Sequence, residues 1–255
     1  MKTISFIMLT IIMLLSSCTM HRKIDDQTYY DFKTKLIVDK TSNYKINISY
    51  PEIFSSDSKM QKNFNQRIKQ FIDGNISYFK KNLPVVTQAD LKDFPKEMQQ
   101  NILSISYSSF VSDAPQMKLV SINFKVKSLH YGRLTPASKN IIFNFNLTED
   151  KPVQLAELFK DDYPYLRVIA DYCKQDLAKR LAPGMPWLTW QSDSIAPKQN
   201  NYQSWTLQPR GILFVFSKEQ LEPYSATGET VLVPFSIINE GLLLDWDNIE
   251  VAKVN

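Results

Sequence analysis

Hydrophobic and polar positions change period several times along the chain, and each period predicts a different element. Over residues 44–50 apolar and polar residues alternate, which is typical of a half-buried strand, and Pro51 is expected to end it. Over residues 60–79 apolar residues recur every three or four positions, which predicts an amphipathic helix. Ser58 is the expected N-cap of this helix.

The same two periods continue through the rest of the chain. A second helix is expected at 163–181, with Cys173 in its apolar stripe, where a buried and inert thiol is the simplest interpretation. Residues 204–216 resemble a hairpin that turns at 209–211, and Pro234 places the last strand at an edge or an end. Further strands are expected at 102–107, 119–126, 141–147 and 230–235. This order predicts the α+β class, with antiparallel sheets packed against helices in two small subdomains.

The first residues carry an export pattern. Lys2 precedes an apolar run at residues 4–15, which is shorter than the roughly 20 residues that span a bilayer. The run ends in Leu-Ser-Ser-Cys at residues 15–18, which resembles the lipobox of bacterial lipoproteins. That resemblance implies a signal peptide at 1–17, cleavage after residue 17, and lipid attached to Cys18.

A lipidated Cys18 implies contact with a membrane through the N-terminal lipid and a location in the cell envelope. Thr19 in place of Asp favours, by the same resemblance, the outer membrane facing the periplasm in a bacterium with two membranes. Residues 18–42 are mostly polar and are interpreted as a tether, although residues 36–38 are compatible with a short strand.

Composition narrows the function classes. The formal charge is +4 over 255 residues and no basic stripe is present, so nucleic acid is not an expected partner. The chain has two cysteines, and lipidation of Cys18 leaves Cys173 without a partner for a disulfide within the chain.

Catalytic motifs are sparse. The chain has two histidines, His21 in the tether and His130, and no Gly-x-Ser-x-Gly motif. One histidine and one free cysteine do not supply a typical zinc site, so we expect no metal and no cofactor. The scarcity of catalytic motifs therefore favours a protein that is not an enzyme. A hydrolase or accessory enzyme of cell-wall remodelling, with His130 as base, is the alternative.

Two C-terminal stretches resemble a known family. Residues 143–159 contain a strand, a turn and Leu-Ala-Glu-Leu-Phe, and residues 211–216 with 223–235 contain two apolar strands around Pro-Tyr-Ser. Both are similar to the RsiV-like extracellular domain of anti-sigma factors that sense lysozyme, which also forms the non-catalytic front half of some polysaccharide deacetylases. The resemblance implies an RsiV-like domain at 116–245 and a small α+β companion domain at 43–115.

This resemblance implies a lipid-anchored binding protein that recognises lysozyme or another cell-wall component such as peptidoglycan. Family members often carry a Gly-Gly-Ala-His turn where this chain has residues 129–136, with a displaced histidine and one glycine. A structural or assembly lipoprotein with a protein partner remains a further alternative. The candidate binding residues are aromatic, basic or histidine side chains of that turn and of the Trp-rich loop: His130, Tyr131, Arg133, Trp187 and Trp190.

Overall fold

The structure is a computed structural model of the whole chain. It describes residues 30–84, 94–95, 99–112, 114, 116–183, 193–246 and 249–254. The predicted signal peptide at 1–17 and Cys18 lie outside the described residues. None of the helices that the structure describes is long and apolar enough to cross a membrane.

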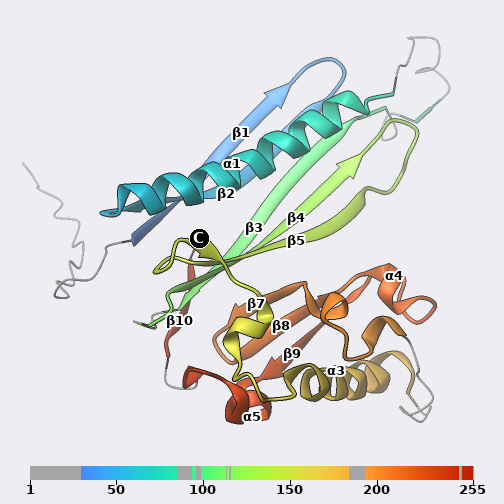
Figure 1. Cartoon of the computed structure of the whole chain (residues 1–255). Coiled ribbons are helices and arrows are strands. Elements are labelled where there is room, and N and C mark those ends of the chain that lie inside the picture. Colours follow the sequence, from blue (N-terminus) through green and yellow to red (C-terminus); the bar gives the residue numbers. More distant parts are fainter. Residues whose placement is uncertain are drawn as a thin grey trace, which may run out of the picture.

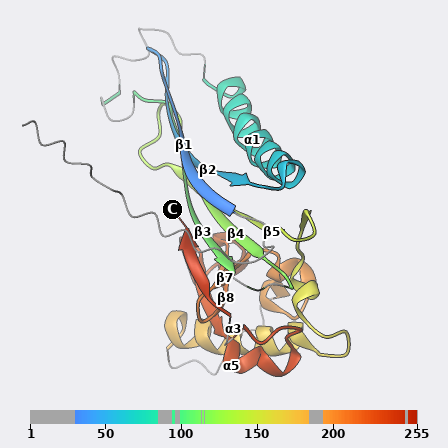
Figure 2. The ribbon, with the colours of Figure 1, turned by 90° about the vertical axis from the view of Figure 1, so that its left-hand side faces the viewer.

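The chain folds as α+β, as predicted. It has two sheets, and each sheet is packed against helices on one side (Figures 1 and 2). The larger sheet follows the order β1-β2-β3-β4-β5-β6, with β10 paired to β3, and its neighbours are antiparallel except β2 and β3. Helix α1 (Ser58–Lys81) lies along one face of this sheet. The strands are β1 (Tyr30–Lys40), β2 (Lys45–Ser55), β3 (Ile102–Ser112), β4 (Leu119–Leu129), β5 (Ala137–Asn146), β6 (Lys151–Pro152) and β10 (Val251–Val254). We call this region the α1 half.

The apolar stripe of α1 packs on the large sheet as its period predicts. Phe64 is 1% exposed, and its ring meets Phe32 of β1 edge-on and Phe145 of β5 edge-on. The N-cap differs from the prediction by one residue, because the carboxylate of Asp57 accepts hydrogen bonds from the backbone N–H groups of Lys59 and Met60. Ser58, the expected cap, is instead the first residue of the helix.

Two strand predictions in the N-terminal part are corrected. Pro51 does not end its strand, because β2 continues to Ser55 with Pro51 paired opposite Thr34. Its pairing with β3 ends at Ile48, so Pro51 lies where β2 has only one neighbour and a missing N–H group is tolerated. Residues 30–40, placed in the tether 18–42 by the sequence, form the strand β1 along the whole of β2.

The second region, the α3 half, is a three-stranded antiparallel sheet in the order β7-β8-β9 with short helices around it. The tight turn between β7 and β8 lies at Pro209 and Arg210, as predicted, and Pro234 ends the outer strand β9. Its elements are the 3₁₀ turns η2 (Leu155–Leu158), η4 (Asp193–Ile195), η5 (Gln199–Tyr202) and η6 (Asn239–Gly241), the helices α3 (Tyr165–Leu181), α4 (Lys218–Leu221) and α5 (Phe235–Ile238), and the strands β7 (Trp205–Gln208), β8 (Gly211–Phe216) and β9 (Glu229–Pro234).

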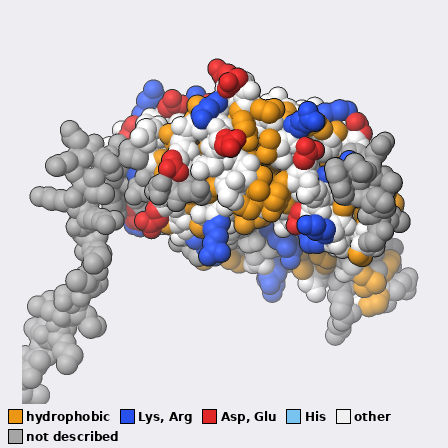
Figure 3. Space-filling view, turned by 90° about the horizontal axis from the view of Figure 1, so that it is seen from below, with side chains coloured by type: hydrophobic (Ala, Val, Ile, Leu, Met, Phe, Trp, Pro, Cys, Tyr) orange, Lys and Arg blue, Asp and Glu red, His pale blue; other side chains and the backbone are white. Residues whose placement is uncertain are grey.

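Helix α3 covers this small sheet with the stripe that the sequence predicts. Cys173 is fully buried in it, and burial raises the pKa of its thiol. On the underside of the molecule, hydrophobic side chains reach the surface between interspersed charges of both signs (Figure 3). The exposed apolar residues of this half include Ile237 and Leu243.

The chain crosses between the two halves more than once. The boundary expected between residues 115 and 116 falls between β3 and β4, which are antiparallel neighbours in one sheet. The α3 half then begins after β6, and β10 returns at the end of the chain to pair with β3. The division in space therefore lies between β6 and η2 rather than between residues 115 and 116, while two α+β regions remain.

Candidate functional site

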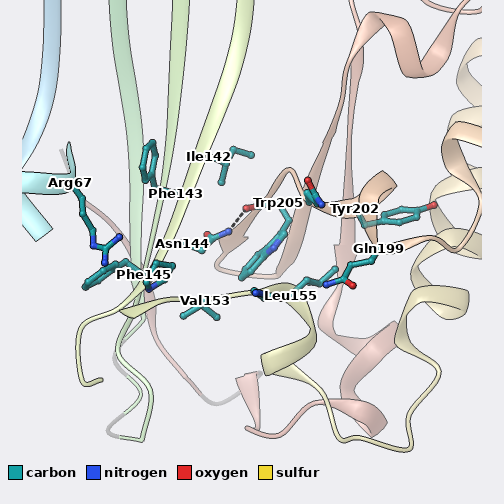
Figure 4. A pocket seen from close by; sticks show the side chains of 13 residues that line it. Arg67, Ile142, Phe143, Asn144, Phe145, Val153, Leu155, Gln199, Tyr202 and Trp205 are labelled. Carbon is teal, nitrogen blue, oxygen red and sulfur yellow. Dashed lines mark hydrogen bonds between the residues drawn. The ribbon is translucent and has the colours of Figure 1, made fainter. Parts of the chain in front are cut away.

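A cavity of about 450 Å³ opens between the two halves, beside strand β5 (Figure 4). One wall comes from β5 and α1, and the other comes from η5, β7 and the link between β6 and η2. Apolar and amide side chains make up most of its lining, which is the usual composition of a ligand pocket. The lining residues are Arg67, Ile142, Phe143, Asn144, Phe145, Pro152, Val153, Gln154, Leu155, Gln199, Tyr202, Gln203 and Trp205.

Two buried aromatic residues form the wall of the α3 half. Trp205 begins β7 and Tyr202 ends η5, and they are 2% and 1% exposed. The Tyr202 hydroxyl donates a hydrogen bond of 2.7 Å to the carbonyl oxygen of Ile195, and burial raises the pKa of that hydroxyl. Both rings are therefore held in place before any ligand enters, so this wall is preorganised.

A hydrogen-bonded junction of Ser121, Asn144, Trp205 and Leu207 joins the halves beside the cavity. The Ser121 hydroxyl donates to Asn144 Oδ1 at 2.6 Å, and Asn144 Nδ2 donates to the Trp205 carbonyl at 2.8 Å. Ser121 Oγ also accepts from the backbone N–H of Leu207 at 2.9 Å. Because Ser121 is fully buried, these bonds fix β7 against β4 and β5.

Arg67 is the one charged side chain among the described residues that line the cavity. It lies on the exposed side of α1, with its guanidinium carbon 5.9 Å from the centre of the Phe145 ring. No described residue forms an ion pair with it. A guanidinium in this state has its hydrogen-bond donors available for a carboxylate of a ligand.

The structure places His130, Tyr131 and Arg133 together in the turn between β4 and β5, at the end of the long strands away from the α3 half (Figure 1). The His130 ring packs on Phe79 at the end of α1, with ring centres 5.4 Å apart. His130 Nδ1 is buried and has no hydrogen-bond partner among the described residues. The turn thus brings His130 against the core of the α1 half rather than beside a nucleophile.

The other two turn residues differ in exposure. The Tyr131 ring meets Phe94 edge-on at 5.3 Å, and its backbone N–H donates to Asn101 Oδ1. Gly132 supplies the positive φ of 77° that the turn requires, and Arg133 is exposed. Trp187 and Trp190, the remaining candidates, lie outside the described residues.

The sequence did not point to the cavity, because its lining residues look like ordinary core and surface positions. Ile142, Phe143 and Trp205 fall within predicted strands, and Arg67 lies off the apolar stripe of the helix predicted at residues 60–79. The available signal was the group of four amides in one polar loop, at Gln199, Asn200, Asn201 and Gln203. In the part of the chain that the structure describes, no three histidine, cysteine or acidic side chains gather as a metal site would require.

Comparison with known protein families finds a match for most of the α3 half. Residues 156–236 match DUF3298. The family is described as a protein of unknown function. The DUF3298 match covers α3 and the β7-β8-β9 sheet, including Tyr202 and Trp205, but neither β5 nor Arg67. The match shows a likeness of the C-terminal region to DUF3298, and the finer resemblance to RsiV-like domains stays a prediction.

Similar proteins cover most of the chain. The immunogenic protein MPB64 of Mycobacterium bovis and the immunogenic protein MPT64 of Mycobacterium tuberculosis are each 28% identical over 203 residues, which is 78% of this chain and 78% of theirs. The crystal structure of a DUF3298 family member from Bacteroides fragilis superposes with a TM-score of 0.58 at 14% identity, over 85% of this chain and 94% of that one.

A second crystal structure, of a DUF3298 family protein from Pseudomonas aeruginosa, has a TM-score of 0.51 at 9% identity and covers 87% of this chain and 97% of that one. At such low identity, these two likenesses establish the fold alone. They extend it beyond the matched residues 156–236, because both neighbours cover more than four fifths of the chain.

Proposed function

We propose that this chain is a lipid-anchored binding protein of the cell envelope, which recognises a protein or a cell-wall component without catalysing a reaction. The supporting observation is the cavity between the two halves, which combines a mostly apolar lining, several amides and Arg67 as the one described charge. Amides both donate and accept hydrogen bonds, and Arg67 offers donors for a carboxylate, so the lining suits recognition better than proton transfer.

The envelope location rests on the N-terminal sequence. The export pattern and Leu-Ser-Ser-Cys at residues 15–18 favour attachment through lipid at Cys18. The similarity to proteins named as immunogenic is compatible with an envelope or extracellular protein. In a bacterium with two membranes, Thr19 favours the outer membrane, facing the periplasm.

The binding function is tested with the full chain, purified in detergent, on resin that carries lysozyme and on insoluble peptidoglycan. We expect retention on one of these at micromolar protein. Arg67→Ala is expected to weaken retention roughly tenfold, because a charge-assisted hydrogen bond to the ligand is lost. Absence of retention on both materials would reject recognition of lysozyme or peptidoglycan.

Arg133→Ala is the matched control, since Arg133 is also an exposed arginine but lies in the turn between β4 and β5. We expect this variant to bind like the unmodified chain. If Arg133→Ala weakens retention and Arg67→Ala does not, the site is the turn with His130 and Tyr131, and the cavity is not the binding site.

The anchor is tested by labelling growing bacteria with an alkyne-bearing fatty acid. The unmodified chain is expected to take up the label and to sediment with membranes, and Cys18→Ser is expected to lose both properties. Cys173→Ala, which removes the only other cysteine, controls for labelling at a thiol elsewhere. Unchanged labelling of Cys18→Ser would contradict the lipid anchor.

A further inference from the structure

Among the described residues, strand β5 has a pairing partner along only part of one of its edges, beside the cavity. On one side it pairs with β4 without interruption from Ala137 to Asn146. On the other side β6 pairs only with Phe145 and Asn146, and the N–H of Val153 donates to the carbonyl of Asn144. Successive residues of a strand turn their backbone groups to opposite sides, so the N–H and C=O of Ile142 and Asn140 point to the same side as those of Asn144.

The described residues supply no hydrogen-bond partner to the backbone of Ile142 or Asn140 on that side. Strand edges in this state are templates for another strand, and proteins that do not use them usually cover or shorten them. The open edge of β5 continues directly into the cavity, because Ile142 and Phe143 are among the residues that line it. An added strand would therefore have both a backbone partner and a pocket for side chains.

The two faces of β5 at this edge differ in chemistry. Ile141 and Phe143 pack on the core under α1, and by alternation Lys139 points to the same face. Arg67 lies on that face too, on α1 and over the ring of Phe145 (Figure 4). The side chain of Ile142 points to the opposite face, toward Trp205 and the α3 half (Figure 4). One face thus offers two cations and the other offers an apolar cavity.

We propose that the open edge of β5 binds an extended, acidic peptide segment of a partner protein by strand addition. Acidic side chains of the segment face Arg67 and Lys139, and the alternate apolar side chains enter the cavity toward Trp205. The backbone of the segment pairs with Ile142 and Asn140. This inference rests on the proposed binding function and specifies the chemical class of its ligand.

The probe is the peptide Glu-Val-Glu-Val-Glu-Val-Glu, labelled with fluorescein, and its binding to the full chain in detergent is followed by fluorescence anisotropy. Ile142→Pro removes the outward N–H group without removing a bond to β4, and proline is tolerated on an edge strand in this orientation. Ile142→Ala is the matched control, because it shortens the side chain and keeps the N–H. We expect Ile142→Pro to bind roughly tenfold more weakly than Ile142→Ala.

Charge is tested separately with the lysine counterpart, Lys-Val-Lys-Val-Lys-Val-Lys, and with Arg67→Ala. The lysine peptide is expected not to bind, and Arg67→Ala is expected to bind the acidic peptide several-fold more weakly, with the difference reduced at high salt. Far-ultraviolet circular dichroism of each variant confirms that its fold is retained.

Equal binding by Ile142→Pro and Ile142→Ala would overturn strand addition, and equal binding of the two peptides would overturn the acidic preference. If the full chain forms a dimer that Ile142→Pro dissociates, the occupant of the edge is a second copy of this chain and the proposal is wrong. If lysozyme or peptidoglycan is retained equally well by Ile142→Pro and Ile142→Ala, the proposed binding function stands and only strand addition fails.

Discussion

The α1 half and the α3 half each pack a helix on a sheet whose strands are antiparallel, apart from the parallel pair β2 and β3, yet their cores are built differently. In the α1 half one long helix covers a sheet of long strands, and Phe64, Ile68 and Ile72 repeat along a single stripe. In the α3 half the core collects residues from many short elements, and its helix α3 supplies only part of it. The residues of a core made from long periodic elements can be predicted from the sequence. The residues of a core made from many short elements depend on which distant segments pack together in the fold.

The halves also differ in the probes that they carry. All four tryptophans lie at residue 187 or later, so tryptophan fluorescence reports on the C-terminal region. Trp205 and Trp246 are buried in the core of the α3 half. Circular dichroism in the far ultraviolet reports on both halves, because both contain helix and strand. Comparison of the two signals therefore tests whether the halves unfold as one unit.

The largest expected effect comes from Phe64→Ala in the core of the α1 half. Phe64 is 1% exposed and packs between the rings of Phe32 and Phe145, so its removal leaves a cavity and should lower the free energy of unfolding by about 3–5 kcal/mol. We expect urea unfolding followed by circular dichroism and by tryptophan fluorescence to shift equally. A fluorescence transition that stays in place while the circular dichroism transition moves would show that the halves unfold independently.

A smaller effect is expected at the hydrogen-bonded junction between the halves. Ser121→Ala removes the acceptor of the Leu207 N–H, which is then left without that partner in a buried position, and the donor to the partly buried Asn144 Oδ1. The free energy of unfolding should fall by about 1–3 kcal/mol. Ser106→Ala, on the exposed face of β3, is the control and should change it by less than about 0.5 kcal/mol. Equal effects of the two variants would mean that the junction adds nothing to stability.

The smallest expected effect is an increase in the free energy of unfolding. Glycine-to-alanine substitutions are expected to have opposite signs at one position of the α1 half and one position of the α3 half. Gly74 lies within α1 with no atom within 4 Å of an added Cβ, so Gly74→Ala should raise the free energy of unfolding by about 0.5–1 kcal/mol. Gly241 lies in η6, where an added Cβ would overlap the ring of Tyr163, so Gly241→Ala should destabilise the protein. Thermal denaturation of both variants measures the two signs, and stabilisation by Gly241→Ala would contradict the close packing at Tyr163.

Much of the fold could be predicted because the decisive patterns are local. The stripe from Met60 to Phe79 predicted α1, and the stripe around Cys173 predicted α3. The tight turn at Pro209 and Arg210 was also predicted correctly. In these elements the apolar positions of the buried face and the turn residues lie within one short stretch of sequence, so the pattern can be recognised locally.

The candidate site could not be predicted in the same way. His130 and Tyr131 are conspicuous residue types, but in the structure their rings pack on Phe79 and Phe94. The cavity is instead formed by common residues that become neighbours only through the fold. Asn144 and Trp205 are 61 residues apart in the chain and are joined by a hydrogen bond. A single sequence contains no local pattern for such a contact.

The sequence by itself determined the helical and strand periods, the class of the fold and the export pattern that ends at Cys18. Only the tertiary structure decided that residues 30–40 pair as β1, that residues 251–254 return as β10, and that no described strand covers the edge of β5 beside the cavity. The physical reason is the separation along the chain of the residues that each feature depends on. Side-chain periodicity acts over a few residues, whereas edges and cavities depend on which distant segments pack together and which backbone groups remain without a neighbour.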